Sequence, residues 1–171
     1  MPTLISGSTG VNKIQDGTIV NADINSSAAI AGTKLVMPTG SVLQAQITGY
    51  TSSSPIVVSN TGSATLMTIT ITVRANSKVM MWFDSHQTAL SGTNVNPNVT
   101  FAMDGSDISP DTNHYFYQSG GRTVIHKIFL TGALSAGSHT FTVVGEAYNG
   151  SVTYNYQSNN GGRFMLQEIA G

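Results

Sequence analysis

The sequence predicts an all-β protein: a short extended N-terminal arm or stalk over residues 1–38, followed by an antiparallel β-sandwich of the jelly-roll type over residues 39–171. Three observations predict this class. The chain is poor in charge and rich in Ser, Thr, Gly and Asn, apolar residues alternate with polar ones at a period of two, and Asn-Gly and Gly-Gly pairs separate the alternating segments. We expect the sandwich to be a homotrimer, because a charge-poor, threonine-rich sheet leaves a face that three copies can bury jointly.

Composition excludes several functional classes. Of the 171 residues, 7 are basic and 8 acidic, so 9% are charged, against about a quarter in a typical domain. With no basic excess we expect no nucleic acid partner, and with no cysteine there is no disulfide framework, Cys-ligated zinc or thiol nucleophile. We expect no membrane contact either, since no apolar run reaches the roughly 18 residues of a spanning helix and no signal-peptide pattern is present.

The N-terminal segment carries a loose repeat. The repeat contains Ile14, Ile19, Ile24 and Ile30, at a spacing of 5, 5 and 6, and Leu35 follows them. These intervals match neither the helical period of about 3.6 nor the strand period of about 2. Because one copy offers no face wide enough to bury these side chains, we expect them to form a stalk with neighbouring chains or to dock on a larger structure. The alternative is a flexible N-terminal arm.

Residues 41–171 are predicted to form one strand after another. The clearest is Thr65–Val73, in which apolar side chains alternate with threonines, as is typical of a sheet with one face in a core and one in water. Lys78–Phe83 is apolar on both faces, so we expect a central strand covered on both sides, and we expect its Met80-Met81-Trp82 run to pack against the second sheet or a sister subunit. The other expected strands are Val42–Ile47, Pro55–Ser59, Asn98–Met103, Arg122–Leu130, His139–Tyr148, Val152–Tyr156 and Arg163–Ile169.

Turn sequences separate these strands. Asn149-Gly150 predicts a β-hairpin, because a type I′ turn needs two residues with positive φ and Asn-Gly supplies them. Asn159–Gly162 predicts a second hairpin by the same argument. No stretch longer than a turn or two has a helical pattern, and about eight short strands at this spacing indicate a sandwich or jelly roll.

Candidate catalytic groups are sparse. Of the four histidines, His126 and His139 have no His, Glu or Asp at a metal-ligand spacing, and Asp84 and His86 fall on one face of a strand, which is a weak signal. No Gly-x-Ser-x-Gly elbow marks a nucleophilic serine. The only glutamates, Glu146 and Glu168, lie in separate strands, and nothing in the sequence singles out one of them as a general acid. We therefore expect no enzyme activity and no cofactor.

Three carboxylates occur in one loop, at Asp104, Asp107 and Asp111. Oxygen-rich loops of this kind can hold calcium, but the Asp-x-Asp-x-Asp-Gly spacing with a distal glutamate is missing. Asp-Gly and Ser-Pro-Asp are also ordinary turn sequences. We therefore expect a plain surface loop and no metal, with these three residues as a weak candidate for a calcium site.

Five tyrosines are candidates for a subunit interface or for stacking on a glycan: Tyr115, Tyr117, Tyr148, Tyr154 and Tyr156. A hairpin that presents two of these rings on one face offers flat, amphipathic surfaces, which serve both purposes. The low surface charge favours the interface over the glycan.

Two phrases in the N-terminal segment are distinctive: Asp16-Gly-Thr-Ile-Val-Asn-Ala-Asp-Ile24 and Ala29-Ile-Ala-Gly-Thr-Lys-Leu35. They resemble the start of tailed-phage tail-fibre and related virion appendage proteins, especially those of phages of cyanobacteria and marine bacteria. The ending Leu166–Gly171 is similar to that of small β-sandwich heads on such fibres. Gly137–Thr142, followed by Tyr-Asn-Gly, is similar to the penultimate strands of jelly-roll heads like those of C1q and tumour necrosis factor.

The resemblance implies a non-enzymatic structural protein of a tailed-phage virion, on the tail fibre or the capsid surface. Residues 1–38 would attach it to other tail or capsid proteins, and residues 39–171 would form a homotrimeric head that adheres to a host-surface glycan or protein. A capsid decoration or cement protein, which stabilises the capsid without touching the host, is the alternative. A secreted C1q-like lectin is a more distant alternative.

Overall fold

The computed structural model describes residues 36–49, 55–85, 88–92, 94–110, 121–154 and 162–171. All of them except Val36 belong to one compact unit, which spans Met37–Gly171. The described residues form strands and loops and include no helix, so the predicted all-β class is confirmed.

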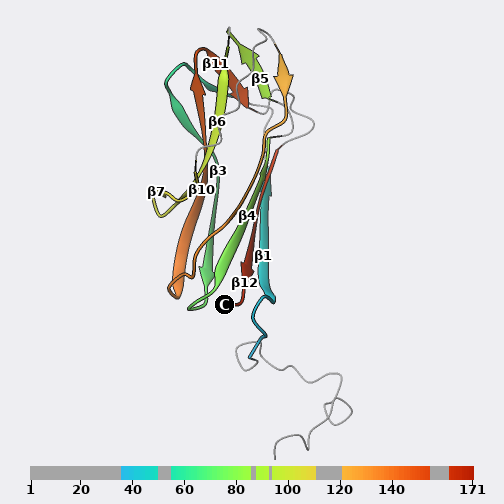
Figure 1. The fold of residues 1–171 in the computed structure, drawn as a ribbon, viewed down its shortest axis with the longest axis vertical. Helices are drawn as coiled ribbons and strands as arrows, with labels where there is room; N and C mark the ends of the chain where they lie inside the picture. Colours follow the sequence, from blue (N-terminus) through green and yellow to red (C-terminus); the bar gives the residue numbers. More distant parts are fainter. Residues whose placement is uncertain (1–35, 50–54, 86–87, 93, 111–120, 155–161) are drawn as a thin grey trace, which may run out of the picture. The chain divides into compact units, whose positions relative to one another are not determined.

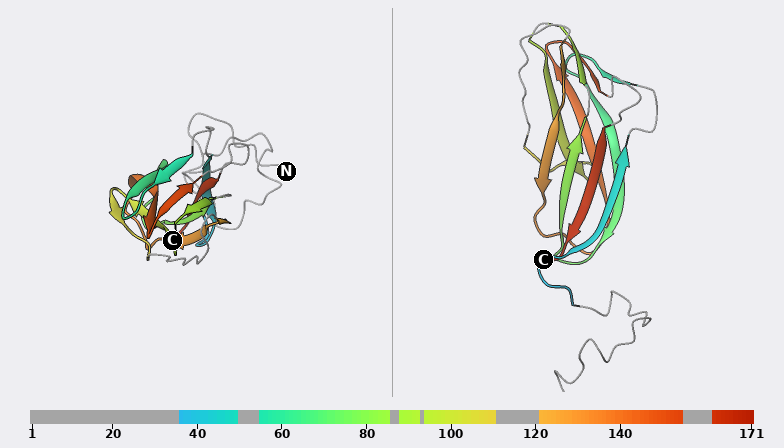
Figure 2. Two further views of the ribbon diagram at one scale, coloured as in Figure 1. Left: turned by 90° about the horizontal axis from the view of Figure 1, so that it is seen from above. Right: turned by 90° about the vertical axis from the view of Figure 1, so that its right-hand side faces the viewer.

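Two four-stranded antiparallel sheets build a sandwich (Figures 1 and 2). The first sheet has the order β1-β12-β4-β9 and the second the order β3-β10-β6-β7. The strands of the first sheet are β1 (Val42–Gly49), β12 (Arg163–Ile169), β4 (Lys78–Asp84) and β9 (His126–Leu130). Those of the second are β3 (Ser63–Val73), β10 (Gly137–Tyr148), β6 (Asn96–Met103) and β7 (Ser106–Asp107).

A third sheet of short strands lies at the end of the sandwich far from the C-terminus (Figure 1). Its strands, in spatial order, are β2 (Ile56–Val58), β11 (Ser151–Tyr154), β5 (Thr88–Ser91) and β8 (Arg122–Thr123). We call this end the distal end. The opposite end, where the Gly40 N–H donates to the Ala170 carbonyl at 2.8 Å, is called the base.

Strands distant in sequence lie side by side. β1 pairs with β12, and β3 pairs with β10, so each sheet joins an early strand to a late one. The chain also crosses between the sheets from β3 to β4 and from β9 to β10. Two four-stranded antiparallel sheets connected in this way form the jelly roll that the strand pattern predicts.

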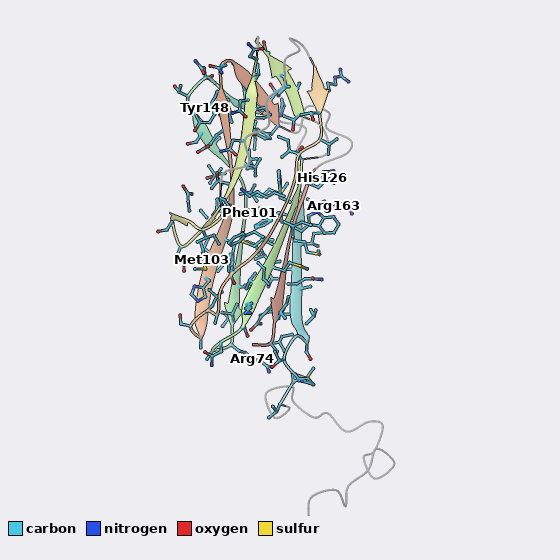
Figure 3. All side chains as sticks on the ribbon, in the orientation of Figure 1. Arg74, Phe101, Met103, His126, Tyr148 and Arg163 are labelled. Carbon is cyan, nitrogen blue, oxygen red and sulfur yellow. The ribbon has the colours of Figure 1, made fainter. Side chains whose placement is uncertain are left out.

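In β3, β4 and β12 every second side chain is buried, as alternation requires, whereas β6 is buried on both faces. Met81 and Phe83 of β4 and Phe164 and Leu166 of β12 are fully buried. Phe101 of β6 stacks on Phe164 with ring centroids 5.8 Å apart, and Figure 3 shows Phe101 between the two sheets. This aromatic contact joins the sheets in the middle of the sandwich.

One buried lysine ties the sheets together. The ammonium of Lys127, on β9, donates to the carbonyl of Val99 at 2.5 Å and to that of Pro110 at 2.7 Å. It also lies 5.5 Å from the centre of the Phe101 ring. Because a buried charge is stable only with such partners, Lys127 fixes β9 against the second sheet.

A buried glutamate also ties the two sheets together, at the base of the sandwich. Glu168 of β12 accepts hydrogen bonds from the Arg74 backbone N–H and from Gln44 Nε2, both at 2.7 Å. Burial alone would raise the pKa of Glu168. The hydrogen bonds from Arg74, Gln44 and Ser77, together with the charge of Arg74, outweigh burial and lower its pKa below the ordinary value. The carboxylate thus joins β1, β12 and the turn after β3.

The turn predicted at Asn149-Gly150 is present, but the hairpin predicted around it is wrong. The two residues have φ of 60° and 148°. β10 pairs with β3 and β6, whereas β11 pairs with β2 and β5 in the third sheet. The Ala147 carbonyl accepts instead from the Thr61 N–H at 2.8 Å. The turn therefore carries the chain from one sheet to another.

Other differences from the prediction are local. The strand predicted over Arg122–Leu130 is divided, because β8 joins the third sheet and β9 the first. Between them the Ile125 N–H donates to Ser85 Oγ at 2.8 Å. The short strands β5 and β7 are not predicted from the sequence, since neither has an alternating pattern long enough to recognise. The turn predicted at Asn159–Gly162 falls mainly outside the described residues.

Candidate functional site

The outer face of the first sheet is apolar. In β4 the Met81 and Phe83 side chains enter the core, so those of Met80 and Trp82 point away from it. Trp82 remains 45% exposed, so the prediction that this strand is covered on both sides is not met within one chain. We call this outer side the apolar face; its members are Ala45, Ile47, Met80, Trp82, Ile128, Leu130 and Met165.

The strand register arranges the apolar face in two rows that cross all four strands. The first row is Ile47, Met165, Trp82 and Ile128. The second is Ala45, Met80 and Leu130, with the polar Gln167 between Ala45 and Met80. Ile47 is 61% exposed, Ile128 67% and Leu130 49%. One exposed apolar side chain is ordinary, but a contiguous row of large ones, such as the first row, marks an interaction surface.

A polar row borders the apolar face on the side nearer the distal end. Asp84 of β4 lies between Arg163 of β12 and His126 of β9, and His126 Nδ1 is 3.7 Å from Asp84 Oδ1. Figure 3 shows His126 and Arg163 on the same side of the sandwich. A hollow of about 150 Å³ lies where this row meets the apolar face, lined by Ile47, Trp82, Asp84, Arg163 and Met165.

The outer face of the second sheet is built from hydroxyl groups. Thr68 and Thr70 of β3 lie directly opposite Thr142 and Thr140 of β10. The hydroxyl oxygens of Thr70 and Thr140 are 2.9 Å apart, and those of Thr68 and Thr142 are 3.5 Å apart. We call this surface the threonine face; its members are Thr68, Thr70, Thr72, Thr140 and Thr142.

Most sequence-predicted site residues lie outside the described residues: Ile14, Ile19, Ile24, Ile30, Leu35, His86, Asp111, Tyr115, Tyr117 and Tyr156. Their roles therefore stay predictions. Tyr148 lies at the exposed end of β10, where its ring is accessible.

Tyr154 is placed differently from the prediction, because it is fully buried. Its hydroxyl donates to the carbonyls of Asn98 at 2.8 Å and Glu146 at 3.1 Å. Gly145 makes room for the ring, since a Cβ at this position would lie 2.7 Å from Tyr154 Cε2. Tyr154 is therefore a core residue, and its ring is not available to a partner or a glycan.

Asp104 of the candidate calcium loop is already engaged. Its Oδ1 accepts from the Thr140 N–H at 2.8 Å, and its Oδ2 lies 2.7 Å from His139 Nδ1. The bond from Thr140, and then that from His139, hold the pKa of Asp104 below its ordinary value. The Asp104 carboxylate, and then the Ser135 carbonyl, raise the pKa of His139. In the described ranges no three His, Cys, Asp or Glu side chains gather to hold a metal, and Asp107 is exposed on β7.

The two glutamates do not form a pair. Glu168 is buried at the base, whereas Glu146 follows the threonine face toward the distal end, where Asn98 Nδ2 donates to it at 2.8 Å. The geometry of paired glycosidase carboxylates is thus not present between them.

Part of the apolar face is predicted from the sequence. The Met80-Met81-Trp82 run predicts a sister subunit as one of its partners. Ile47, Ile128 and Leu130 are not singled out by the sequence, because alternation does not reveal which side of a strand lies outside until its neighbours are known.

No protein-family model matches the chain, and no curated protein matches it. Among solved structures, the chain is similar to dimeric latent PorU from Porphyromonas gingivalis, with 9% identity, a TM-score of 0.42 and coverage of 78% of this chain and 14% of that one. A structure of infectious bursal disease virus Gx strain shows 13% identity and a TM-score of 0.42, covering 83% of this chain and 40% of that one. The sugar-binding EclA C-terminal domain shows 18% identity and a TM-score of 0.32, covering 92% of this chain and 98% of that one.

The chain thus spans less than half the length of the first two structures. At these TM-scores the likenesses carry no argument about function. Within the part of the chain that the structure describes, there is no helix with the length and apolar character needed to cross a membrane.

Proposed function

We propose that this chain is a non-enzymatic structural protein of a tailed-phage virion, a short homotrimeric appendage. Its N-terminal segment attaches to the particle, and its β-sandwich head adheres to a host-surface glycan or protein. The observation that carries the assembly is the apolar face, whose two rows cross all four strands of the first sheet. The N-terminal phrases that resemble virion appendage proteins support the location.

Further copies of the chain are the partners that the apolar face fits. The face is uncharged within its rows, and the charged residues Arg163, Asp84 and Lys78 lie at its two borders. Copies related by a closed symmetry axis bring identical apolar faces together and leave none uncovered. The likeness of Gly137–Thr142 to C1q and tumour necrosis factor heads supports three copies.

The two ends of the head differ in structure. The Gly40 N–H donates to the Ala170 carbonyl and the Ala170 N–H to the Ser41 carbonyl, both at 2.8 Å, so the chain enters the head at the base. The third sheet lies at the other end (Figure 1). We propose that the distal end is the end of the head that contacts the host.

The oligomeric state of the full chain tests the assembly. Size-exclusion chromatography with light scattering is expected to give about three times 17.9 kDa. Ile128→Lys puts a charge on a side chain that the single chain leaves exposed, so we expect folded monomers. The matched control Thr68→Lys puts the same charge on the threonine face and should stay trimeric. A wild-type monomer, or a trimeric Ile128→Lys variant, contradicts the proposal.

Incorporation into particles tests the location. Ile19→Ser with Ile24→Ser, in the full chain, removes two apolar side chains from the N-terminal segment and leaves the head unchanged. We expect trimers that bind purified particles in reduced number. Unchanged incorporation would show that the head, not this segment, makes the attachment. Electron microscopy of the particle then distinguishes a tail appendage from a capsid decoration.

A further inference from the structure

A ring, a carboxylate and amide groups lie together at the distal end of the second sheet. Tyr148 ends β10 and is 39% exposed, and Glu146 lies two residues earlier on the same face of the strand. Asn60 belongs to the turn before β3, and Asn149 to the turn after β10. Figure 3 shows Tyr148 toward the distal end, on the opposite side of the sandwich from Arg163.

The Glu146 carboxylate is held in one orientation. The side chain of Asn98 is fully buried, and its Nδ2 donates to Glu146 Oε2 at 2.8 Å. The Tyr148 hydroxyl donates to the same oxygen at 3.3 Å. Both hydrogen bonds are accepted by Oε2. As far as the described residues are concerned, Glu146 Oε1 can therefore accept a hydrogen bond from a ligand. A carboxylate fixed from the protein side in this way is preorganised to bind a ligand from the solvent side.

The turn beside Tyr148 orients an amide. The Asn149 N–H donates to Asn60 Oδ1 at 2.7 Å, and the Thr61 N–H donates to the Ala147 carbonyl at 2.8 Å. Thr61 and Asn149 have φ of 59° and 60°, so both turns take the left-handed conformation. With Oδ1 engaged, the two Nδ2 hydrogens of the exposed Asn60 side chain are the groups left to bind a ligand.

We propose that Tyr148, Glu146 and Asn60 form a binding site for a neutral pyranose sugar of a host-surface polysaccharide. Neighbouring hydroxyls of a pyranose donate and accept hydrogen bonds, which Glu146 Oε1 and Asn60 Nδ2 complement. The apolar C–H face of the sugar packs on the Tyr148 ring. This inference rests on the adhesion part of the proposed function and names the class of its ligand.

Charge argues against other small ligands. The site contains one carboxylate, and none of its named side chains is basic, so phosphate and acidic sugars are repelled. Calcium takes about six to eight oxygen ligands, which one carboxylate and two amides do not supply. A neutral polyol with an apolar ring face is the ligand that these groups fit.

The site is compatible with assembly through the apolar face. It lies on the outer side of the second sheet, whereas the apolar face belongs to the first. A trimer therefore leaves three copies of the site open near the distal end. Linked sites bind a repetitive polysaccharide with an avidity that one site lacks.

Saturation-transfer NMR on the full chain tests the site, with the methyl glycosides of glucose, galactose, mannose and N-acetylglucosamine as probes. We expect the wild type to bind at least one of them. Tyr148→Ala should raise the Kd about tenfold, whereas Tyr148→Phe keeps the ring and should stay within about twofold. Glu146→Gln turns Oε1 or its partner oxygen into a donor and should raise the Kd about tenfold or more.

Thr142→Ala, on the same face of the same strand, is the matched control and should leave the Kd unchanged. Binding of no probe, or equal binding by wild type and Tyr148→Ala, overturns the inference. Light scattering on the same samples separates the two proposals. Trimers that bind no sugar overturn the sugar site alone, whereas monomers that bind sugar through Tyr148 overturn the trimer alone.

Discussion

The two outer faces of the sandwich follow the same alternation rule but differ in chemistry. On the threonine face, each hydroxyl can bond to a neighbour, as between Thr70 and Thr140, or to water. On the apolar face, Trp82 lies beside Ile128; the Ile128 side chain forms no hydrogen bond with water, and that of Trp82 can do so only through its indole N–H. Exposing apolar area to water costs about 25 cal/mol per Å², so the apolar face is costly in a single subunit. One face therefore suits solvent and the other suits a partner, which is the reverse of the sequence-based expectation that copies bury the face of a threonine-rich sheet.

The largest effect on stability is expected from truncating a buried side chain of β10, compared with truncating its exposed neighbour. Phe141 and Thr142 are neighbours in β10, the first fully buried and the second on the threonine face. Phe141→Ala should lower the free energy of unfolding by about 3–5 kcal/mol, because it leaves a cavity in the core. Thr142→Ala should lower it by less than about 0.5 kcal/mol. Urea denaturation measures both, and equal effects would mean that the strand faces the other way.

The next largest effect is expected on association through the apolar face. The fluorescence of Trp82, the single tryptophan, measures whether another copy covers this face. Trp82 is half-exposed in one chain, so a second copy should bury it and shift its fluorescence to shorter wavelength. Ile128→Lys should weaken association about a hundredfold or more and return the emission toward that of exposed tryptophan. Thr68→Lys should not change the emission. Identical spectra for the two variants would show that no copy covers Trp82.

The inner side of the first sheet is tested at Glu168. Glu168→Gln should cost about 1–3 kcal/mol at neutral pH, because it weakens hydrogen bonds to a buried charge. The folded-state pKa of Glu168 is lower than that of the unfolded chain. Its stabilisation is therefore complete above the unfolded pKa and is lost as the pH falls through the folded value. Urea denaturation of both proteins should show the difference shrinking in acid; a difference constant with pH contradicts this role.

The smallest effect is expected at the edge of the second sheet, where Asp104 contacts His139. The lowered pKa of Asp104 gives stabilisation that is lost as the pH falls through it. The raised pKa of His139 gives stabilisation that is present below the unfolded pKa and is lost as the pH rises through the folded value. The pair thus stabilises most in the acidic window that lies above the unfolded-state pKa of Asp104 and below the unfolded-state pKa of His139.

Asp104→Asn should cost under about 1 kcal/mol in that window, because the carboxylate is half-exposed and screened by solvent. NMR titration should show the pKa of His139 returning toward its ordinary value. Asp107→Asn, on the exposed β7, is the control and should not change the titration. An unchanged pKa in Asp104→Asn would show that the carboxylate does not act on His139.

Strand positions could be predicted because their signal is local. The alternation in Thr65–Val73 predicts nearly all of β3, and the patterns of the last third of the chain predict β10 and β12. The pairing of strands could not be predicted at Asn149-Gly150, where the turn chemistry is right but β11 pairs with β2 and β5. Pairing depends on residues far away in the chain, and a turn sequence contains no information about them.

The candidate sites show the same limit. The sequence identifies Tyr148 as a candidate for a subunit interface or glycan stacking. It does not identify Glu146 as its partner, because the buried Asn98 that holds Glu146 is placed there by the register of β6 against β10. Tyr154 has the same residue type and a similar pattern, yet it fills the space left by Gly145.

The sequence by itself determined the all-β class, the strand-rich head and the scarcity of charge, since composition and a period of two are properties of the chain alone. Only the tertiary structure decided which side of each strand became core and which became surface. Alternation makes the two sides of a strand different, but only the neighbouring strands and the opposite sheet determine which side water reaches. For that reason Trp82 and Phe83, adjacent and both aromatic, lie on opposite faces, one exposed and one buried.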